Sequence, residues 1–287
     1  MPKPFSQSFL QKHGLKHQPF RVALSNESIT QTVVILHRFF TVIRELKTLD
    51  GTPYCNFNPF KLAHQGSRRQ TKDEIDRSLS KKEWLLVQEV IENIPRDTEN
   101  GLKHYHRARW LFNLLFRCFL RRDEVVSLTM CCFKHTDDGW FLEVIGKGGK
   151  KAKIIASDRL MGELSLYRKS LGLPSFPSVA DAAIPLIQSL KGKNTPLSNQ
   201  AIYLICKEVF GRAASLAIER GELDCVEKLS KASPHWMRHT GISHAMEVGI
   251  NPRYVQAQAR HSSLNVTARY DHKNKKIWRN AFNKVNI

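Results

Sequence analysis

The sequence of 287 residues predicts a mainly α-helical protein with one small three-stranded antiparallel sheet, an α+β fold. Two observations lead to this prediction. Through most of the chain, apolar residues recur every three or four positions, as they do on one face of a helix. Between residues 129 and 156 the pattern changes to short apolar runs separated by turn residues, which is typical of strands. The length suggests two domains of about 150 residues each.

The N-terminal part should be a partial helical region followed by a linker. From Ser25 to Leu46 the apolar residues have helical spacing and leave charged residues for the opposite face. The stretch from Asp50 to Gln70 is rich in glycine, proline and asparagine, which favour turns and loops. We therefore place a domain boundary near residue 75, so that residues 1–75 form the first part and residues 76–287 the main domain.

Two helices should open the main domain. Ser80 is a suitable N-cap, and Glu83 completes a capping box before an apolar run that Pro95 ends. The segment from His104 to Leu120 is apolar on nearly every side, which predicts a helix buried in the middle of the domain. We expect this helix to carry Arg121 at its end.

The sheet should be a meander whose strands lie at residues 129–133, 140–145 and 151–156. Asp137-Asp138-Gly139 supplies the first turn, and the glycine-rich segment 146–150 supplies the second. Helices should follow at about 158–170 and 199–219. The segment between those two helices contains three prolines and is expected to be irregular.

Start and stop signals are clear in the last part of the chain. Ser233 can cap a helix that begins at Pro234, and Gly249 is suited to end that helix. Asn251 followed by Pro252 repeats the start signal. The final segment carries three apolar residues at helical spacing, which predict a short helix docked on this chain or on another copy: Trp278, Phe282 and Val285.

The charge of the protein indicates its class of partner. There are 45 basic and 26 acidic residues, which gives a formal net charge of +19. A charge of this size attracts polyanions, and nucleic acid is the leading candidate. The excess is spread over both parts of the chain, so we expect both to face the same partner. The alternative is a merely basic protein.

Composition excludes several other classes. No run approaches the roughly 18 apolar residues of a membrane span, and the first residues lack the apolar core of a signal peptide. We therefore expect a cytoplasmic protein that does not contact membranes. Six cysteines form no CxxC pair and have no histidine spacing suited to zinc. They are interpreted as reduced packing residues, and no metal site is expected.

Several polar residues could bind an anion. His235 and Arg238 share a face in the first turns of a helix, whose free backbone N–H groups favour a phosphate. Arg121 and Glu124 also share a face, where the carboxylate can hold the guanidinium in one orientation. Lys147 lies in a glycine-rich turn that leaves its amine free to approach a ligand.

Each signal also has an ordinary structural explanation. Histidine and arginine are common on helix surfaces, a helix ion pair is often only that, and a lysine-rich turn is usually just solvated. His261 and Tyr270, nine residues apart, would by default be a core or surface pair. Taken singly, none of these residues identifies a function.

Taken in order, these residues resemble the tyrosine recombinase family, which includes phage integrases and Xer-type recombinases. The match covers roughly residues 105–272 and rests on four phrases: RRDEVVSL, VIGKGGKKAKII, SPHWMRHT and RHSSLNVTARY. A weaker resemblance covers Ser25 to Pro59, which looks like the last helix of the family's N-terminal core-binding domain. The resemblance implies a catalytic integrase domain in residues 76–287, preceded by a partial helical core-binding domain in residues 1–75.

The resemblance implies a site-specific recombinase that cleaves and rejoins duplex DNA through a covalent 3′-phosphotyrosine. Tyr270 would be the nucleophile. Arg121 and Arg238 would stabilise the negative charge of the transition state with fixed donors. The phosphodiester energy is stored in the covalent bond, so the resemblance implies no ATP, metal or other cofactor.

The remaining site residues receive their roles from the same resemblance. Lys147 would protonate the leaving 5′-hydroxyl, and His235 would assist proton transfer near the nucleophile. His261 would form a hydrogen bond with the scissile phosphate. Glu124 would support the site indirectly, without contacting the DNA. The implied partners are double-stranded DNA and other copies of the chain, which would form a tetramer on paired sites. The implied location is the cytoplasm, in association with the nucleoid.

Two other functions stay open. One is relaxation of supercoiled DNA with the same phosphotyrosine, as a type IB topoisomerase would perform it. The other is a DNA-binding remnant of an integrase that is inactive in recombination.

The sequence also departs from the family pattern. Phe119 and Arg260 stand where the family usually has glycine, so we expect a changed local backbone there. The family's core-binding domain has about four helices, and residues 1–24 are too short to supply the helices before the last one.

Overall fold

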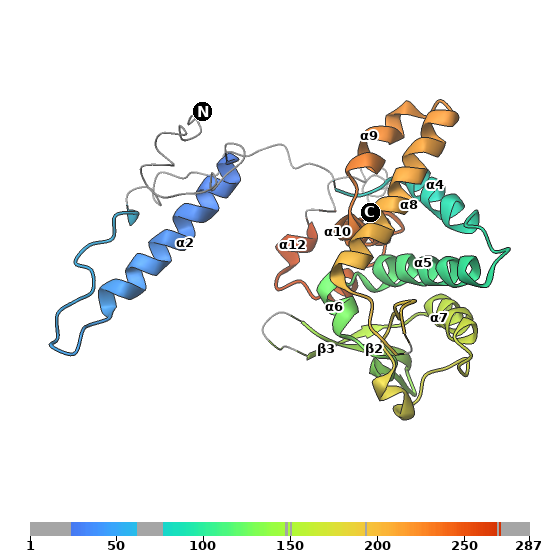
Figure 1. The fold of residues 1–287 in the computed structure, drawn as a ribbon, viewed down its shortest axis with the longest axis horizontal. Coiled ribbons are helices and arrows are strands. Elements are labelled where there is room, and N and C mark those ends of the chain that lie inside the picture. Colours follow the sequence, from blue (N-terminus) through green and yellow to red (C-terminus); the bar gives the residue numbers. More distant parts are fainter. Residues whose placement is uncertain are drawn as a thin grey trace, which may run out of the picture. The chain divides into compact units, whose positions relative to one another are not determined.

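The computed structural model describes residues 24–61, 77–146, 149, 151–192, 194–268 and 270. The chain divides into two compact units, Met1–Ile75 and Asp76–Ile287 (Figure 1). Within the described ranges, no helix is long and apolar enough to cross a membrane.

In the first unit, the structure describes one long helix and the loop after it. Helix α2 (Asn26–Glu45) begins after Ser25, whose hydroxyl accepts a hydrogen bond from the Ser28 N–H at 3.2 Å. The following loop folds back on the helix, because the Asn58 amide donates to the His37 carbonyl at 2.8 Å. The predicted amphipathic helix and the loop after it are therefore present.

The second unit consists mostly of helices, with a small sheet at one end (Figure 1). The helices are α4 (Lys81–Glu92), α5 (Glu99–Cys118), α6 (Arg122–Ser127), α7 (Asp158–Ser170), α8 (Asn199–Glu219), α9 (Leu223–Lys231), α10 (Pro234–Glu247), α11 (Pro252–Ala259) and α12 (Leu264–Ala268). Two short 3-10 turns accompany them: η1 (Met130–Cys132) and η3 (Val179–Ala183). The strands β1 (Phe133–Thr136), β2 (Gly139–Ile145) and β3 (Lys151–Ile155) pair antiparallel in the order β1-β2-β3. The predicted mainly helical α+β fold is confirmed.

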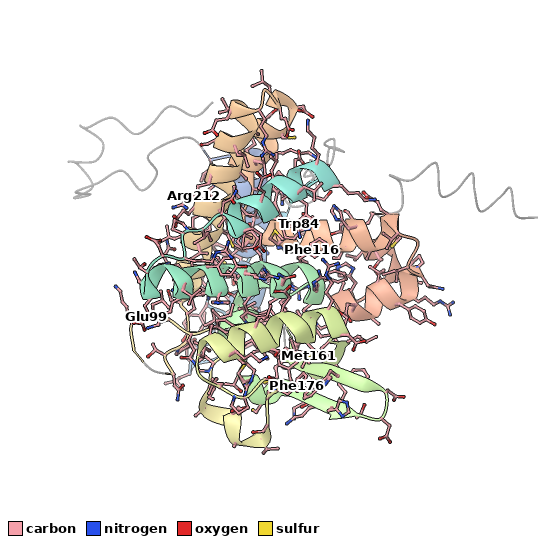
Figure 2. The ribbon with its side chains drawn as sticks, turned by 90° about the vertical axis from the view of Figure 1, so that its right-hand side faces the viewer. Trp84, Glu99, Phe116, Met161, Phe176 and Arg212 are labelled. Atoms are coloured by element: carbon pink, nitrogen blue, oxygen red, sulfur yellow. The ribbon has the colours of Figure 1, made fainter. Side chains whose placement is uncertain are left out.

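Helix α4 begins as its sequence predicts. The Ser80 hydroxyl accepts from the Glu83 N–H at 3.3 Å, and the Glu83 carboxylate accepts from the Ser80 N–H at 2.6 Å. Two of the N–H groups that lack a helical partner are thereby satisfied. On the inner face, Trp84 stacks on Phe116 of α5 with ring centroids 4.7 Å apart (Figure 2). The capping box therefore fixes α4 against the central helix.

Helix α5 is the centre of the apolar core. Trp110 is almost fully buried, and its indole N–H donates to the Leu186 carbonyl at 2.9 Å. The helix begins five residues earlier than predicted, because the Thr98 hydroxyl accepts from the Gly101 N–H at 3.0 Å and caps it. The prediction followed the apolar run and missed this polar first turn.

The expectation that Arg121 lies at the end of the central helix is wrong. Helix α5 ends at Cys118, and Phe119 takes a left-handed conformation with φ of 50°. This conformation turns the chain, as it does at many helix ends. Arg121 therefore occupies the N-cap position of the next helix, α6.

The first strand is also shifted from its predicted place. Residues 130–132 form η1, and β1 begins at Phe133, which pairs with Leu142 of β2. The reason is a long-range contact: the Met130 N–H donates to the Ile184 carbonyl at 2.8 Å, and Thr129 bridges Pro185. This segment thus pairs with the loop after η3 instead of with β2.

The later helices largely follow their start signals. Helices α7 and α8 have the predicted bounds, whereas α9 is not predicted. Helix α10 begins at Pro234, but the side chain of Ser233 makes no capping hydrogen bond. Asn251 does cap α11, because its side chain accepts from the Arg253 N–H at 2.9 Å. The predicted terminal helix with Trp278, Phe282 and Val285 lies outside the described residues.

A glycine allows α10 to lie against α5. A Cβ atom added at Gly241 would lie 2.1 Å from the Phe116 carbonyl oxygen and 2.7 Å from the Phe119 ring. Because backbone cannot yield as a flexible side chain does, the two helices would have to separate. This close contact sets the distance between the end of α5 and α10, which carries the candidate residues His235 and Arg238.

Gly241→Ala is therefore expected to lower the free energy of unfolding by about 3 kcal/mol, the upper part of the range for overpacked cores. Gly162→Ala on α7 is the matched control, since nothing lies within 4 Å of a Cβ added there. That control should gain up to about 1 kcal/mol from the better helix propensity of alanine. Urea denaturation measures both values, and equal stabilities would contradict the packing argument.

A side chain also connects α11 to the sheet. The Gln258 amide accepts from the Ile155 N–H at 2.9 Å and donates to the Ile155 carbonyl at 2.9 Å. Gln258 thus supplies to β3 the two hydrogen bonds that a neighbouring strand residue would make. This contact holds the end of α11, and the residues that follow it, at a fixed place beside the sheet.

Candidate active site

The candidate residues that the structure describes come from three places in the second unit. Arg121 and Glu124 lie at the start of α6, and His235 and Arg238 lie in the first turns of α10. His261 and Tyr270 follow α11 and α12 respectively. Lys147 lies outside the described residues. The contacts below bring the six described residues into one cluster.

In the first half of the cluster, Glu124 contacts two arginines. Its buried carboxylate accepts from the Arg121 backbone N–H at 2.7 Å and lies 3.1 Å from the Arg121 guanidinium. The same carboxylate lies 2.7 Å from Nη2 of Arg260, 136 residues along the chain. Two guanidinium groups therefore share one carboxylate, which restricts their orientation.

Arg238 is held by backbone carbonyls. Its side chain is buried, and its two terminal nitrogens donate to the carbonyl oxygens of Phe119 and Ala259. Within the described part of the chain, no carboxylate forms an ion pair with it. Burial, with Arg121 and Arg260 nearby, lowers the pKa of Arg238 to about 10, so the group stays positive at neutral pH.

The residues that replace the family's usual glycines adopt a conformation that favours glycine. Phe119 has φ of 50° and Arg260 has φ of 55°. Whether the backbone differs from that of the family at these positions stays a prediction. The left-handed conformation costs a side-chain-bearing residue about 1–2 kcal/mol. At Arg260, the ion pair with Glu124 offsets part of this cost.

Arg260→Gly and Arg260→Ala should separate the two effects. Both variants lose the ion pair with Glu124, but only glycine relieves the left-handed backbone. We expect Arg260→Ala to be less stable than Arg260→Gly by about 1 kcal/mol. Urea denaturation of the two variants gives the difference directly. Two equal values would mean that the backbone at this position carries no strain.

The second half of the cluster is a line of three side chains. The Tyr270 hydroxyl lies 2.5 Å from Nδ1 of His239, and Nε2 of His239 lies 2.9 Å from Nε2 of His235. Burial, followed by the nearby charges of His235 and Arg238, lowers the pKa of His239 to about 4. At neutral pH His239 is therefore uncharged, so one ring nitrogen can accept a hydrogen bond.

His261 also lies beside the tyrosine. Its ring is almost parallel to that of Tyr270, with centroids 6.4 Å apart, and its Nδ1 lies 2.9 Å from the Thr267 hydroxyl. Burial and the positive charges of Arg238 and Arg121 lower the pKa of His261 to about 4. The neutral ring can accept from Thr267 at Nδ1, which leaves the proton on Nε2 for donation to a ligand.

The charges of the cluster suit an anion. Arg121, Arg238 and Arg260 bring three positive charges to one buried carboxylate, Glu124. The surplus is positive, and the guanidinium groups present planar donors that match phosphate oxygens. A phosphate bound to these arginines would lie near the Tyr270 hydroxyl. The arrangement thus offers donors for phosphate oxygens beside a hydroxyl group.

Two residues of the cluster were not among the candidates from sequence. Arg260 was noted only as a departure from the family pattern, and its contact with Glu124 depends on folding. His239 could have been found, because it lies four residues after His235 and so shares its helix face.

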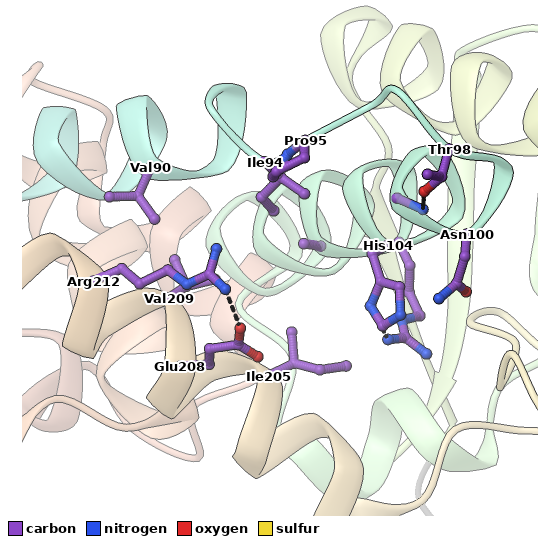
Figure 3. A pocket seen from close by; sticks show the side chains of 13 residues that line it. Val90, Ile94, Pro95, Thr98, Asn100, His104, Ile205, Glu208, Val209 and Arg212 are labelled. Atoms are coloured by element: carbon purple, nitrogen blue, oxygen red, sulfur yellow. Dashed lines mark hydrogen bonds and ion pairs between the residues drawn. The ribbon is translucent and has the colours of Figure 1, made fainter.

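A separate cavity of about 380 Å³ lies between α4, α5 and α8 (Figure 3). Its lining includes His104 and Arg212, and Nη2 of Arg212 lies 2.7 Å from Glu208. None of the candidate residues lines it. The described residues also contain no group of three histidine, cysteine or acidic residues that could hold a metal ion.

Comparison with solved structures defines the class of the fold. The XerH site-specific recombinase bound to palindromic difH substrate, in a post-cleavage complex, matches with a TM-score of 0.63 and 19% identity. The match covers 91% of this chain and 68% of that one. The Tn1549 transposon integrase in complex with transposon right end DNA matches with a TM-score of 0.57 and 17% identity, covering 96% and 82%. The fold is therefore that of the tyrosine recombinases.

The chain belongs to the phage integrase family, whose family model matches residues 85–276. This span is more than half of the chain and contains every candidate residue. The resemblance that the four sequence phrases carry is confirmed.

Curated relatives match a similar part of the chain. Tyrosine recombinase XerA from Pyrococcus furiosus is 26% identical over 213 residues, which cover 74% of this chain and 63% of the relative. Tyrosine recombinase XerC from Staphylococcus saprophyticus is 26% identical over 188 residues, covering 66% and 56%. The chain thus spans about three fifths of the length of these relatives.

Proposed function

We propose that the protein is a site-specific DNA recombinase that cleaves and rejoins duplex DNA through a covalent 3′-phosphotyrosine at Tyr270. The observation that carries this proposal is that Arg121, Arg238 and His261 form one charged cluster, and that Tyr270 lies beside Arg238 and His261 in it. Membership of the phage integrase family supports it. The relatives named above are tyrosine recombinases, and two of the similar solved structures contain their DNA.

In the proposed reaction the arginines stabilise the negative charge that develops at phosphorus. Attack on phosphorus gathers negative charge on the non-bridging oxygens, and Arg121 and Arg238 stabilise that charge. Glu124 holds Arg121 in place, and backbone carbonyls hold Arg238. Because these donors are fixed before DNA binds, little reorganisation is needed in the transition state.

The remaining groups handle hydrogen bonds and protons. His261 donates from Nε2 to a phosphate oxygen, and Lys147 protonates the leaving 5′ oxygen. His235 assists proton transfer on the nucleophile side of the phosphate. Each role is assigned by the position of the residue in the family's motifs, and the contacts of His235 and His261 are compatible with it.

The proposal extends to the domains and the partners. Residues 76–287 form the catalytic domain, and residues 1–75 form a partial core-binding region that contacts DNA with α2. The net charge of +19 supports a DNA partner for both parts. Recombination joins two sites, so we propose that the protein acts as a tetramer on paired sites, in the cytoplasm at the nucleoid.

The first test is capture of the covalent intermediate. The full chain and its Tyr270→Phe variant are expressed in cells that carry the native flanking DNA, and protein is recovered after denaturation. Sequencing of the attached DNA should show one short sequence, and only with the wild-type protein. DNA binding without any adduct would instead indicate a binding protein that has lost strand transfer.

A plasmid with two copies of the mapped sequence then tests recombination. A recombinase should exchange the two copies and give products that depend on both sites. Relaxation of a plasmid with one copy, without exchange on the two-site plasmid, would contradict recombination and support a topoisomerase-like activity.

A further inference from the structure

We infer that His239 is a catalytic residue that takes the phenolic proton of Tyr270 and passes it through His235 to solvent. This inference deepens the proposed function and rests on it, because it needs Tyr270 to be the nucleophile. It assigns to His239 the direct contact with the nucleophile and makes His235 the outer member of a proton path.

The geometry of the line supports this direction. The Tyr270 hydroxyl contacts Nδ1 of His239 at 2.5 Å, whereas Nε2 of His239 contacts Nε2 of His235 at 2.9 Å. The rings of His235 and His239 meet edge to face, with centroids 4.5 Å apart. His239 therefore lies between the nucleophile and His235, and it bonds one of them through each ring nitrogen.

The burial of the groups changes along the line. His239 and Tyr270 are partly buried, and His235 is exposed. A proton that reaches His235 can thus leave to water. The tyrosine ring itself packs against the small apolar cluster of Phe119, Ile242, Met246, Val255 and Ala259, which keeps its hydroxyl at His239.

The charges around His239 favour its neutral, proton-accepting form. The groups that face it come from every neighbouring element: His235 and Arg238 on α10, Arg77 before α4, His261 after α11 and Tyr270 after α12. Its low pKa of about 4 in the free protein follows first from burial, and then from His235, Arg238, Arg77 and His261. A phosphodiester brings negative charge to the same place, which favours the positive imidazolium once the proton arrives.

The step balances in atoms and protons. The bond from the Tyr270 oxygen to phosphorus forms, and the bond from phosphorus to the 5′ oxygen breaks. The phenolic proton moves to Nδ1 of His239, and the proton on Nε2 of His239 moves to Nε2 of His235. His235 then releases its Nδ1 proton to water, and the leaving 5′ oxygen takes a proton from Lys147. Religation runs the same path in reverse.

The test measures cleavage rates on a duplex that carries the mapped sequence and a nick that traps the covalent product. His239→Asn keeps a polar group near the Nδ1 position but cannot take a proton. We expect cleavage about 100-fold slower than wild type at pH 7, the range seen for loss of a general base. His235→Asn leaves the contact between Tyr270 and His239 intact and should cause a smaller loss.

The pH dependence distinguishes proton transfer from a structural role. With His239 in place, the rate should be nearly independent of pH between 7 and 9. In His239→Asn the phenol must ionise by itself, so the rate should rise about tenfold per pH unit toward the phenol pKa near 10. His244→Gln is the matched control on the same helix, because His244 contacts the Leu79 carbonyl and not Tyr270. It should keep the wild-type profile.

Three outcomes would overturn the inference: a His239→Asn rate equal to wild type, a flat pH profile in that variant, or a larger loss in His235→Asn than in His239→Asn. A second readout needs no DNA. The ¹⁵N chemical shift of His239 Nδ1 should differ between the wild-type protein and the Tyr270→Phe variant. Equal shifts in the two proteins would also overturn the inference. If the wild-type protein forms no adduct at all, it is the proposed function that fails.

Discussion

Tyr270→Phe is expected to abolish covalent attachment to DNA and to leave DNA affinity nearly unchanged. The substitution removes only the nucleophilic oxygen. The ring still packs against the apolar cluster around Phe119 and Met246, so the fold should be kept. A gel-shift titration at fixed salt gives the affinity, and denaturing electrophoresis of the same mixture gives the covalent product.

The two readouts separate chemistry from binding. Residual covalent product at more than trace level would remove Tyr270 from the role of nucleophile. A large loss of affinity would mean that the hydroxyl also contacts DNA. Because phosphate contacts dominate DNA affinity and come from many basic residues, we expect the affinity to change by less than about twofold.

Arg121→Ala and Arg238→Ala are expected to slow cleavage by about 100- to 1,000-fold each, the range seen for removal of one strong donor from an oxyanion site. The two variants should differ in stability. Arg121 is exposed and caps nothing with its side chain, so the fold should be little affected. Arg238 is buried, and its loss leaves the Ala259 carbonyl without its side-chain donor, at about 1–3 kcal/mol. The Phe119 carbonyl keeps only a longer contact, 3.4 Å, with Nη2 of Arg260.

Arg212→Ala is the matched control for lost charge. Arg212 lies on α8 beside the separate cavity and pairs with Glu208, away from the cluster (Figure 3). Its loss removes one positive charge but no candidate donor. Single-turnover cleavage should therefore be near normal in Arg212→Ala. Near-normal cleavage in Arg121→Ala or Arg238→Ala would remove that arginine from the site.

Local signals in the sequence predicted the helix starts well. The Ser80 and Glu83 pair and Asn251 were identified as helix starts, and each makes a capping hydrogen bond. Such signals act within four residues, so they need no knowledge of the fold. The Ser233 side chain is the exception, since it makes no capping bond although Pro234 does begin the helix.

Long-range contacts decided the features that sequence missed. The first strand shifted because Thr129 and Met130 pair with residues near 185, and β3 is bonded by Gln258, 103 residues away. The contact between Arg260 and Glu124 is of the same kind. The left-handed backbone at Arg260 and Phe119 could not be predicted either, because the usual sequence signal for that conformation is a glycine.

The most direct test of strand transfer through Tyr270 is to locate the nucleotide on the protein. DNA-linked protein is digested with nuclease and protease, and the peptides are sequenced by tandem mass spectrometry. The account predicts a nucleotide joined through its 3′-phosphate to Tyr270 and to no other residue. A nucleotide on another side chain, or a 5′-phosphate linkage at Tyr270, would contradict it.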